Sequence, residues 1–346
     1  MLGALVDDLV GELGGRPLVV VSDTRVMPLH ARPLAERLRD RGLSVAELSF
    51  PEGEASKSRE TKARLEDRLF ELGVGRDAVL IAVGGGVTGD LVGFIASTWH
   101  RGATVVQVPT TVLAMSDAAL GGKTAVNLPG AKNLVGTVHQ PWGIYADVSV
   151  LRTLDEAEYR NGFAEVIKSA VIADASFFRW LESAAGELVR RDPAALERAV
   201  LRCLEIKSRV VARDERESGR RAVLNFGHTI GHALEAASGY RMRHGEAVAA
   251  GICLEGRLAV GETGFPRTAL ERLERLVGAF GLPARPPAEL SADAIAAATY
   301  RDKKVVAGKV HYALPVRIGR MLPGSGVTLP LDEARLRGVV EEASTG

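Results

Sequence analysis

The run AVLIAVGGGVTGD, residues 78–90, decides the fold class of this chain. Its apolar half ends in glycines and a helical pattern follows, which is typical of a buried strand that leads into a helix. The glycines match G-x-G-x-x-G, a loop whose backbone N–H groups can approach a phosphate. A standard dinucleotide fold places an acid about twenty residues further on, but Pro109, Thr110 and Thr111 occupy that region. The loop therefore favours a nucleotide site outside the standard dinucleotide fold.

Short apolar runs alternate with helical patterns over the first half of the chain. Strands are predicted at residues 18–21, 45–48, 78–83, 104–108 and 143–146, with helices such as 58–72 and 88–99 between them. Strands that alternate with helices form a parallel sheet with helices on both faces. The acids that could hold a ribose follow the earlier strands, at Asp23 and Glu54.

The second half has a different pattern. Apolar residues recur with helical spacing at 155–173, 193–213, 228–237, 246–261 and 269–280. Residues 309–318 resemble a short strand that could rejoin the sheet. The expected fold class is an α/β nucleotide-binding lobe, residues 1–153, followed by an all-α lobe, residues 154–346.

The charges of the chain nearly cancel. Lys and Arg total 44, and Asp and Glu total 43, which gives a net charge of +1 and argues against a nucleic-acid or membrane-surface protein. No apolar run approaches the roughly 18 residues of a membrane span. Cys203 and Cys253 lie in apolar helical patterns, as reduced buried thiols do. The first residues lack the basic start of a signal peptide, so a cytoplasmic protein is expected.

A second informative stretch is NFGHTIGHALEAASGYRMRHGE, residues 225–246, which holds three of the seven histidines. His228 and His232 share one face of a predicted helix, and Glu235 lies on the same face. His244 opens the next predicted helix and can fold back toward His228. Imidazole is a common ligand of zinc-like metals, but a solvated polar face explains the pattern equally well.

One acid stands in an apolar helical segment, FAEVIKSA. Glu165 there could form an ordinary ion pair with Lys168, three residues on. A carboxylate among apolar residues is costly unless it is paired or bound to a metal. With His228 and His244 it would complete a site of two histidines and one glutamate, with positions left open as in catalytic metal sites.

Lysines and glycines follow the nucleotide loop, in DAALGGKTAVN and GAKN. Lys123 and Lys132 suit a phosphate or a carboxylate, because each is a mobile charge with three donors. An exposed lysine on a surface loop is the commoner case for either residue. Arg101, at the end of a predicted helix, could likewise be a partner of the helix dipole.

These segments together resemble the 3-dehydroquinate synthase family of the sugar phosphate cyclase superfamily. The resemblance covers about residues 17 to 318 and is carried by PEGEASKSRETK, GGGVTGDLVGF, RGATVVQVPTTVLA, DAALGGKTAVN, AKNLVGTVHQP, GFAEVIKS, RRAVLNFGHTIGHALE, HGEAVAAG and RDKK. It implies a nucleotide-binding lobe, a helical metal lobe, a homodimer, and the cofactors NAD and one Zn²⁺ or Co²⁺ ion.

The resemblance also implies roles for particular residues. The metal ligands would be Glu165, His228 and His244. NAD would contact Asp23, Glu54, Lys57, Gly85, Gly86, Gly89, Asp90, Thr110, Thr111, Lys123, Lys132 and Thr153. The sugar phosphate would be surrounded by Arg101, Asp117, Lys123, Lys132, Asn133, Lys168, Lys207, Arg221, Asn225, His232, Lys303 and Lys304.

The implied reaction converts 3-deoxy-D-arabino-heptulosonate 7-phosphate, a phosphorylated sugar acid, into 3-dehydroquinate and phosphate. It combines NAD-mediated oxidation, phosphate elimination, reduction and intramolecular aldol closure. One alternative is another sugar phosphate cyclase, which would make a valiolone or an inosose. A metal-dependent polyol dehydrogenase of the glycerol type would instead release NADH. A nucleotide-binding regulatory protein without catalysis is the third alternative.

Overall fold

The computed structural model divides into two compact units, Met1–Asp155 and Glu156–Gly346. Each unit has its own hydrophobic core, built on a sheet in the first unit and among helices in the second. None of the described helices is long and apolar enough to cross a membrane. The structure describes residues 2–215, 219–300, 305–306, 309–323 and 328–345.

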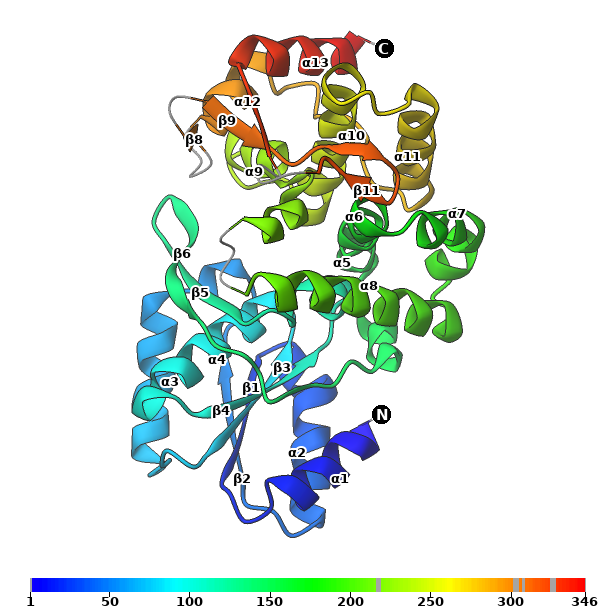
Figure 1. The fold of residues 1–346 in the computed structure, drawn as a ribbon. Coiled ribbons are helices and arrows are strands. Elements are labelled where there is room, and N and C mark those ends of the chain that lie inside the picture. Colours follow the sequence, from blue (N-terminus) through cyan, green and yellow to red (C-terminus); the bar gives the residue numbers. More distant parts are fainter. Residues whose placement is uncertain (1, 216–218, 301–304, 307–308, 324–327, 346) are drawn as a thin grey trace. The chain divides into compact units, whose positions relative to one another are not determined.

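A five-stranded parallel sheet forms the centre of the first unit (Figure 1). All five predicted strands are present, and neighbouring strands are parallel as predicted. The strand order reverses between β1 and β3, and parallel sheets bind ligands at the carboxyl ends of strands at such a point. In spatial order the strands are β2 (Val45–Phe50), β1 (Leu18–Asp23), β3 (Val79–Gly84), β4 (Thr104–Pro109) and β7 (Gly143–Ile144).

Helices cover both faces of this sheet. Because side chains alternate along a strand, Leu18 and Val20 of β1 pack with α1 and α2, whereas Val19 and Val21 pack with α3 and α4. Both faces of the central strands are thus buried, which explains their uninterrupted apolar runs. The helical elements are α1 (Leu2–Glu12), η1 (Met27–Ala31), α2 (Arg32–Asp40), η2 (Glu54–Ser56), α3 (Arg59–Glu71), α4 (Gly86–Thr98), η3 (Trp99–Arg101), η4 (Ala114–Ala118) and η5 (Val148–Thr153).

The first unit also contains an antiparallel hairpin that the sequence pattern does not predict. β5 (Lys123–Leu128) pairs with β6 (Ala131–Val138). Every residue of β6 is at least partly exposed, so no apolar face marks it as a strand. Lys123 and Lys132 consequently lie on paired strands and not on a flexible loop.

Helices form most of the second unit. Its central helix, α10, packs against α6, α9, α11 and α13 (Figure 1). The bounds of α8 and α9 agree with the predicted helices, whereas the predicted helix at 155–173 is divided into α5 and α6 at Gly162. The elements are α5 (Glu156–Asn161), α6 (Phe163–Ala173), α7 (Ala175–Val189), α8 (Pro193–Arg213), η6 (Arg220–Asn225), α9 (His228–Ala237), α10 (His244–Glu262), α11 (Arg267–Ala279), α12 (Ala292–Thr299) and α13 (Glu333–Thr345).

Residues 309–318 do not rejoin the parallel sheet, so this part of the prediction is wrong. Their side chains at Val310, Tyr312 and Leu314 pack in the helical core of the second unit. The second unit is therefore mainly helical and also contains two small antiparallel sheets. Their strands are β8 (Val305–Val306), β9 (Lys309–Tyr312) and β12 (Leu329–Leu331) in one sheet, and β10 (Pro315–Arg317) and β11 (Arg320–Met321) in the other.

Asp174 joins α6 to α7 and caps α7. Its Oδ1 accepts hydrogen bonds from the backbone of Ser176 (2.9 Å) and Phe177 (3.0 Å), and its Oδ2 accepts one from Arg202 Nε (2.7 Å). Burial acts to raise the pKa of Asp174, but the hydrogen bonds from Ser176, Phe177 and Arg202 lower it to about 2. The charged carboxylate therefore stabilises the folded state.

Replacement of Asp174 by alanine is expected to lower the free energy of unfolding by about 1–2 kcal/mol, the usual cost of losing an N-cap. The charge-dependent part is complete above the unfolded-state pKa of about 4 and is lost as the pH falls through the folded-state pKa of about 2. Urea unfolding of wild type and Asp174→Ala should thus show a gap that narrows between pH 4 and pH 2. A gap that stays constant across this range would contradict the assignment.

Candidate functional site

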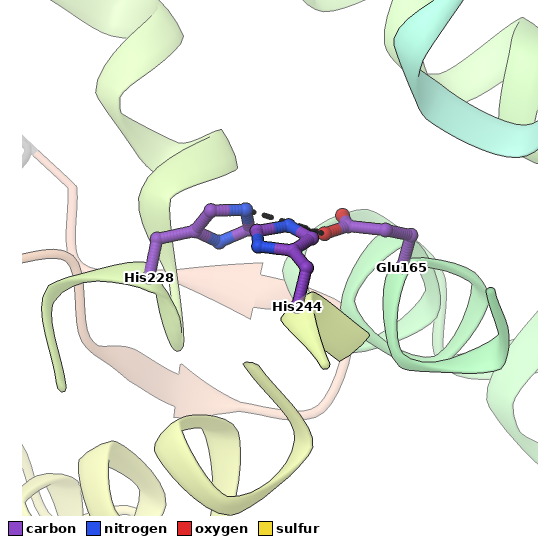
Figure 2. Close-up of side chains that lie close together, drawn as sticks. All are labelled: Glu165, His228 and His244. Atoms are coloured by element: carbon purple, nitrogen blue, oxygen red, sulfur yellow. Dashed lines mark ion pairs between the residues drawn. The ribbon is translucent and has the colours of Figure 1, made fainter. Parts of the chain in front are cut away.

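Side chains from three helices of the second unit meet at one point (Figure 2). Glu165 lies on α6, His228 opens α9 and His244 opens α10. Nε2 of His228 is 3.2 Å, and Nε2 of His244 is 3.5 Å, from the same Oε1 atom of Glu165. One ligand atom from each side chain lies within 4.8 Å of the other two. A single divalent cation could therefore contact all three.

Both imidazoles direct Nε2 toward Glu165 because Nδ1 has a partner of its own. Nδ1 of His228 lies 3.3 Å from the carbonyl oxygen of Phe226, and Nδ1 of His244 lies 3.2 Å from Oε2 of Glu235. A neutral imidazole that donates its Nδ1 proton keeps the lone pair on Nε2. We infer that Nε2 is the metal-facing nitrogen of each ring.

The environment of Glu165 fits a bound cation. Its side chain is 1% exposed, and Lys168 forms an ion pair with it. Neither of its carboxylate oxygens has a hydrogen-bond partner of good geometry among the described residues. Lys168 contacts Oε2, and a metal cation would complete the surroundings of Oε1, which both imidazoles face. One carboxylate with two imidazoles is a ligand set that suits Zn²⁺ or Co²⁺.

Two residues of this cluster, Glu165 and His228, are held in the deprotonated form that binds a metal. Burial raises the pKa of Glu165, but Lys168 and His228 outweigh it and hold that pKa well below its usual range. Burial lowers the pKa of His228 to about 4 despite the attraction of Glu165. Burial also acts to lower the pKa of His244, but the neighbouring carboxylates of Glu165 and Glu235 raise it to about 10. Metal binding at this cluster is therefore expected to depend on pH.

Helices α9 and α10 cross in close contact, which sets the separation of the two metal-facing rings. A Cβ atom at Gly251 would lie 2.1 Å from the backbone oxygen of Gly227. Gly227 has a φ of +80°, in the left-handed region that favours glycine. The two backbones thus approach closely, and the Ile252 side chain lies against Gly227.

A buried carboxylate on α10 holds the amino end of α9. Glu255 is fully buried, and it accepts hydrogen bonds from the backbone N–H groups of Gly227 (2.7 Å) and Ile230 (3.1 Å). It replaces the side-chain cap that a glycine cannot supply. Glu255 was not among the predicted residues, although an acid inside the apolar run GICLEGRLA is a usable signal.

His232 lies close to this cluster, and other residues predicted for the substrate lie on elements of the same unit. The exposed His232 ring lies 5.4 Å from the His228 ring and 6.0 Å from the His244 ring, measured between centroids. The turn η6, which carries Arg221 and Asn225, packs against α6 and α8. Three of the predicted cations are buried, namely Lys168, Lys207 and Arg221. Lys303 and Lys304 lie outside the described residues.

In the first unit, the predicted nucleotide loop lies at the carboxyl end of β3. Gly85 precedes the first turn of α4 and provides no side-chain cap. The backbone N–H of Thr110 donates to Gly84 O (2.9 Å), and Asp23 at the end of β1 accepts from the backbone of Arg25 and Val26 (both 2.9 Å). An uncapped helix amino end where the strand order reverses is suited to a pyrophosphate. Gly86, Gly89 and Asp90 follow in α4, and Thr111 follows β4.

A polar network joins α4 to the hairpin. Buried Lys57 contacts Asp90 (2.5 Å) and the side chain of Asn133. Glu54 accepts a hydrogen bond from Asn127 Nδ2 (2.7 Å), and Asn127 Oδ1 accepts one from the backbone of Asn133 (3.0 Å). Four predicted residues are thus brought together, with Asn127 as a link that the sequence analysis did not assign.

Arg101 lies apart from this network. It precedes the amino end of β4 and lines a pocket with Arg16, Arg76 and His139. The glycine loop follows the carboxyl end of β3, so the two features lie at opposite ends of parallel strands. The contact of Arg101 with the sugar phosphate stays a prediction.

Two further predicted residues have local partners in the first unit. Thr153 Oγ1 lies 2.7 Å from Nε2 of His30, and it donates to the carbonyl of Val150. Asp117 lies in η4, which packs against α4. Their roles toward NAD and substrate stay predictions.

Solved structures of two enzymes resemble the whole chain. A 2-deoxy-scyllo-inosose synthase complexed with carbaglucose-6-phosphate, NAD⁺ and Co²⁺ is 28% identical with a TM-score of 0.88, over 95% of this chain and 91% of that chain. A 2-epi-5-epi-valiolone synthase from Streptomyces hygroscopicus with NAD⁺ and Zn²⁺ bound is 30% identical with a TM-score of 0.87, over the same fractions. The fold is that of the sugar phosphate cyclases.

Sequence comparison narrows this class to one family. The family described as 3-dehydroquinate synthase matches with its N-terminal part over residues 47–161 and its C-terminal part over residues 162–305. The 3-dehydroquinate synthase of Desulforamulus reducens is 45% identical over 308 residues, which cover 89% of this chain and 86% of that protein. The chain belongs to the 3-dehydroquinate synthase family.

Proposed function

We propose that this chain converts 3-deoxy-D-arabino-heptulosonate 7-phosphate into 3-dehydroquinate and phosphate, with NAD and one divalent metal ion. The observation that carries the proposal is the convergence of Glu165, His228 and His244 in a member of this family. The metal is Zn²⁺ or Co²⁺, which are the ions in the two similar structures.

The second unit supplies the metal ligands and the positive charge. Glu165 contributes an anionic oxygen, and His228 and His244 contribute nitrogens. A metal ion held by these three ligands would polarise a substrate hydroxyl and lower its pKa. The substrate carries a phosphate and a carboxylate, which need cations in a site that excludes water. Lys168, Lys207, Arg221 and the exposed His232 are assigned to charge compensation and proton transfer.

The first unit supplies the nucleotide site. Bound NAD⁺ would accept a hydride from the substrate and return it within the same turnover. The amino end of α4, next to Gly85 and Gly86, is assigned to the pyrophosphate, and both similar structures contain NAD⁺. Lys57 holds Asp90 and the hairpin residue Asn133 against this end of the helix. A homodimer, which the family implies, and a cytoplasmic location, which the sequence pattern favours, both stay predictions.

Purified protein supplied with NAD⁺ and Co²⁺ is expected to release phosphate from the heptulosonate phosphate without net growth of absorbance at 340 nm. The reason is that NAD is reduced and reoxidised in each turnover. Exhaustive chelation should stop the release, and added Co²⁺ should restore it. The matched controls are glucose 6-phosphate and sedoheptulose 7-phosphate, which lack the carboxylate.

The other outcomes of this assay separate the alternatives. Faster turnover of a control sugar would place the chain with the inosose or valiolone synthases, to which it is 28–30% identical. Net NADH formation from glycerol would favour a polyol dehydrogenase. Full activity after chelation would contradict the metal-dependent mechanism.

A further inference from the structure

The carboxylate of Glu235 lies behind the metal-facing cluster. Glu235 is on α9, two helical turns after His228, and its side chain is 4% exposed. Its Oε2 lies 3.2 Å from Nδ1 of His244, whose Nε2 faces Glu165 at 3.5 Å. The His244 imidazole is therefore held between two buried carboxylates.

Rigid elements fix this contact on both sides. The carbonyl oxygen of Glu235 accepts hydrogen bonds from the backbone N–H of Tyr240 (2.7 Å) and from Ser238 Oγ (2.9 Å). Ser238 Oγ in turn accepts from the backbone N–H of Met242 (3.3 Å). Hydrogen bonds thus link the turn before α10 to Glu235, the residue whose carboxylate contacts His244.

The two histidines of the cluster differ in what supports them. Nδ1 of His228 faces a neutral backbone carbonyl, that of Phe226, whereas Nδ1 of His244 faces the carboxylate of Glu235. A charged acceptor makes the stronger hydrogen bond. It also makes the imidazole a more basic ligand and fixes the orientation of the ring. His244 is therefore the ligand that depends on a second side chain.

We propose that Glu235 is a positioning residue for the metal centre. Its carboxylate accepts the Nδ1 proton of His244 and presents Nε2 of that ring to the cation. The inference rests on the metal centre proposed above, in which Glu165, His228 and His244 are the ligands. It adds Glu235 to the residues on which metal affinity depends.

The test is a titration of metal-free protein with Co²⁺ alone, followed by visible absorption. We expect one ion per chain for wild type and an affinity about 10–100-fold lower for Glu235→Ala, the usual effect of removing such a partner. Glu235→Gln should lose less, because its amide oxygen can still accept the Nδ1 proton. The Co²⁺ spectrum should change in Glu235→Ala, since the orientation of His244 is then no longer fixed, and should change less in Glu235→Gln.

Glu246→Gln is the matched control. Glu246 accepts a hydrogen bond from the backbone N–H of Arg243 (3.0 Å) and caps α10 two residues after His244. The Glu246→Gln variant should bind Co²⁺ with the affinity of wild type. An equal loss of affinity in this variant would show that the start of α10 matters and that the Glu235 carboxylate does not.

The remaining outcomes are distinct. Wild-type affinity and an unchanged spectrum in both Glu235 variants would overturn the role of Glu235 and leave the metal centre intact. Failure of wild type to bind Co²⁺ would overturn the proposed metal centre itself. Two ions per chain, with one lost in Glu235→Ala, would make Glu235 a ligand in its own right, together with His232 and His244, whose ligand atoms also lie within 4.8 Å of one another. Circular dichroism confirms folding in each case.

Discussion

Glu165→Gln is expected to lose the metal ion and turnover. The substitution keeps the shape of the side chain and removes the negative charge that faces Nε2 of both His228 and His244. Loss of a supporting residue around a metal costs about 10–100-fold in affinity, so loss of a ligand should cost more than about 100-fold. Metal analysis after dialysis and the rate of phosphate release measure the two effects.

The variant also leaves Lys168 buried without its carboxylate partner. Breaking a buried ion pair by removing one member costs about 3–5 kcal/mol, whereas replacing both members is often neutral. The double variant Glu165→Gln with Lys168→Met therefore separates a folding defect from a loss of metal. Glu158→Gln, at a half-exposed position on α5, is the control. Wild-type metal content in a folded Glu165→Gln protein would remove Glu165 from the site.

Gly251→Ala is expected to reduce both stability and metal affinity. The added methyl group would lie 2.1 Å from the backbone oxygen of Gly227 and 2.8 Å from the backbone nitrogen of Gly231. Overpacking usually costs about 1–3 kcal/mol, and the upper end applies here because backbone atoms cannot rotate away. Since α9 must shift, His228 moves relative to His244. Thermal unfolding and Co²⁺ titration report the two consequences.

Gly261→Ala on the same helix is the matched control. A Cβ atom there meets nothing within 4 Å, and removing a glycine from an exposed helix position stabilises it by about 0.5–1 kcal/mol. Opposite signs for the two variants are expected. An unchanged unfolding temperature and affinity in Gly251→Ala would show that the crossing of α9 and α10 does not determine the site.

The sequence predicts those features that depend on neighbours along the chain. The five parallel strands follow from apolar runs, and the bounds of α8 and α9 follow from clear helical periodicity. The hairpin of β5 and β6 could not be predicted in this way. Strand β6 is exposed, so it lacks the alternation of apolar and polar residues that marks a half-buried strand. The small sheets of the second unit are short, and their burial depends on the helices around them.

The candidate site shows the same division. The metal-facing residues could be proposed from residue type and spacing, helped by the family resemblance. Glu235 could be placed on the correct helix face, but its contact with His244 depends on the geometry of the turn between α9 and α10. Glu255 and Gly251 lie on α10 and contact the start of α9. No local sequence pattern shows that these two helices pack together.

The close crossing of α9 and α10 limits how this centre can be re-engineered. At Gly251 and Gly227 the backbones of the two helices lie in close contact. The separation of the two imidazoles is therefore set by backbone atoms. Helix α6 is buried by side chains, which can be exchanged for others of similar volume. To fit a larger or smaller ion, substitutions should therefore change the side chains that pack against α6 behind Glu165. Helices α9 and α10, which carry the two histidines, should be left unchanged.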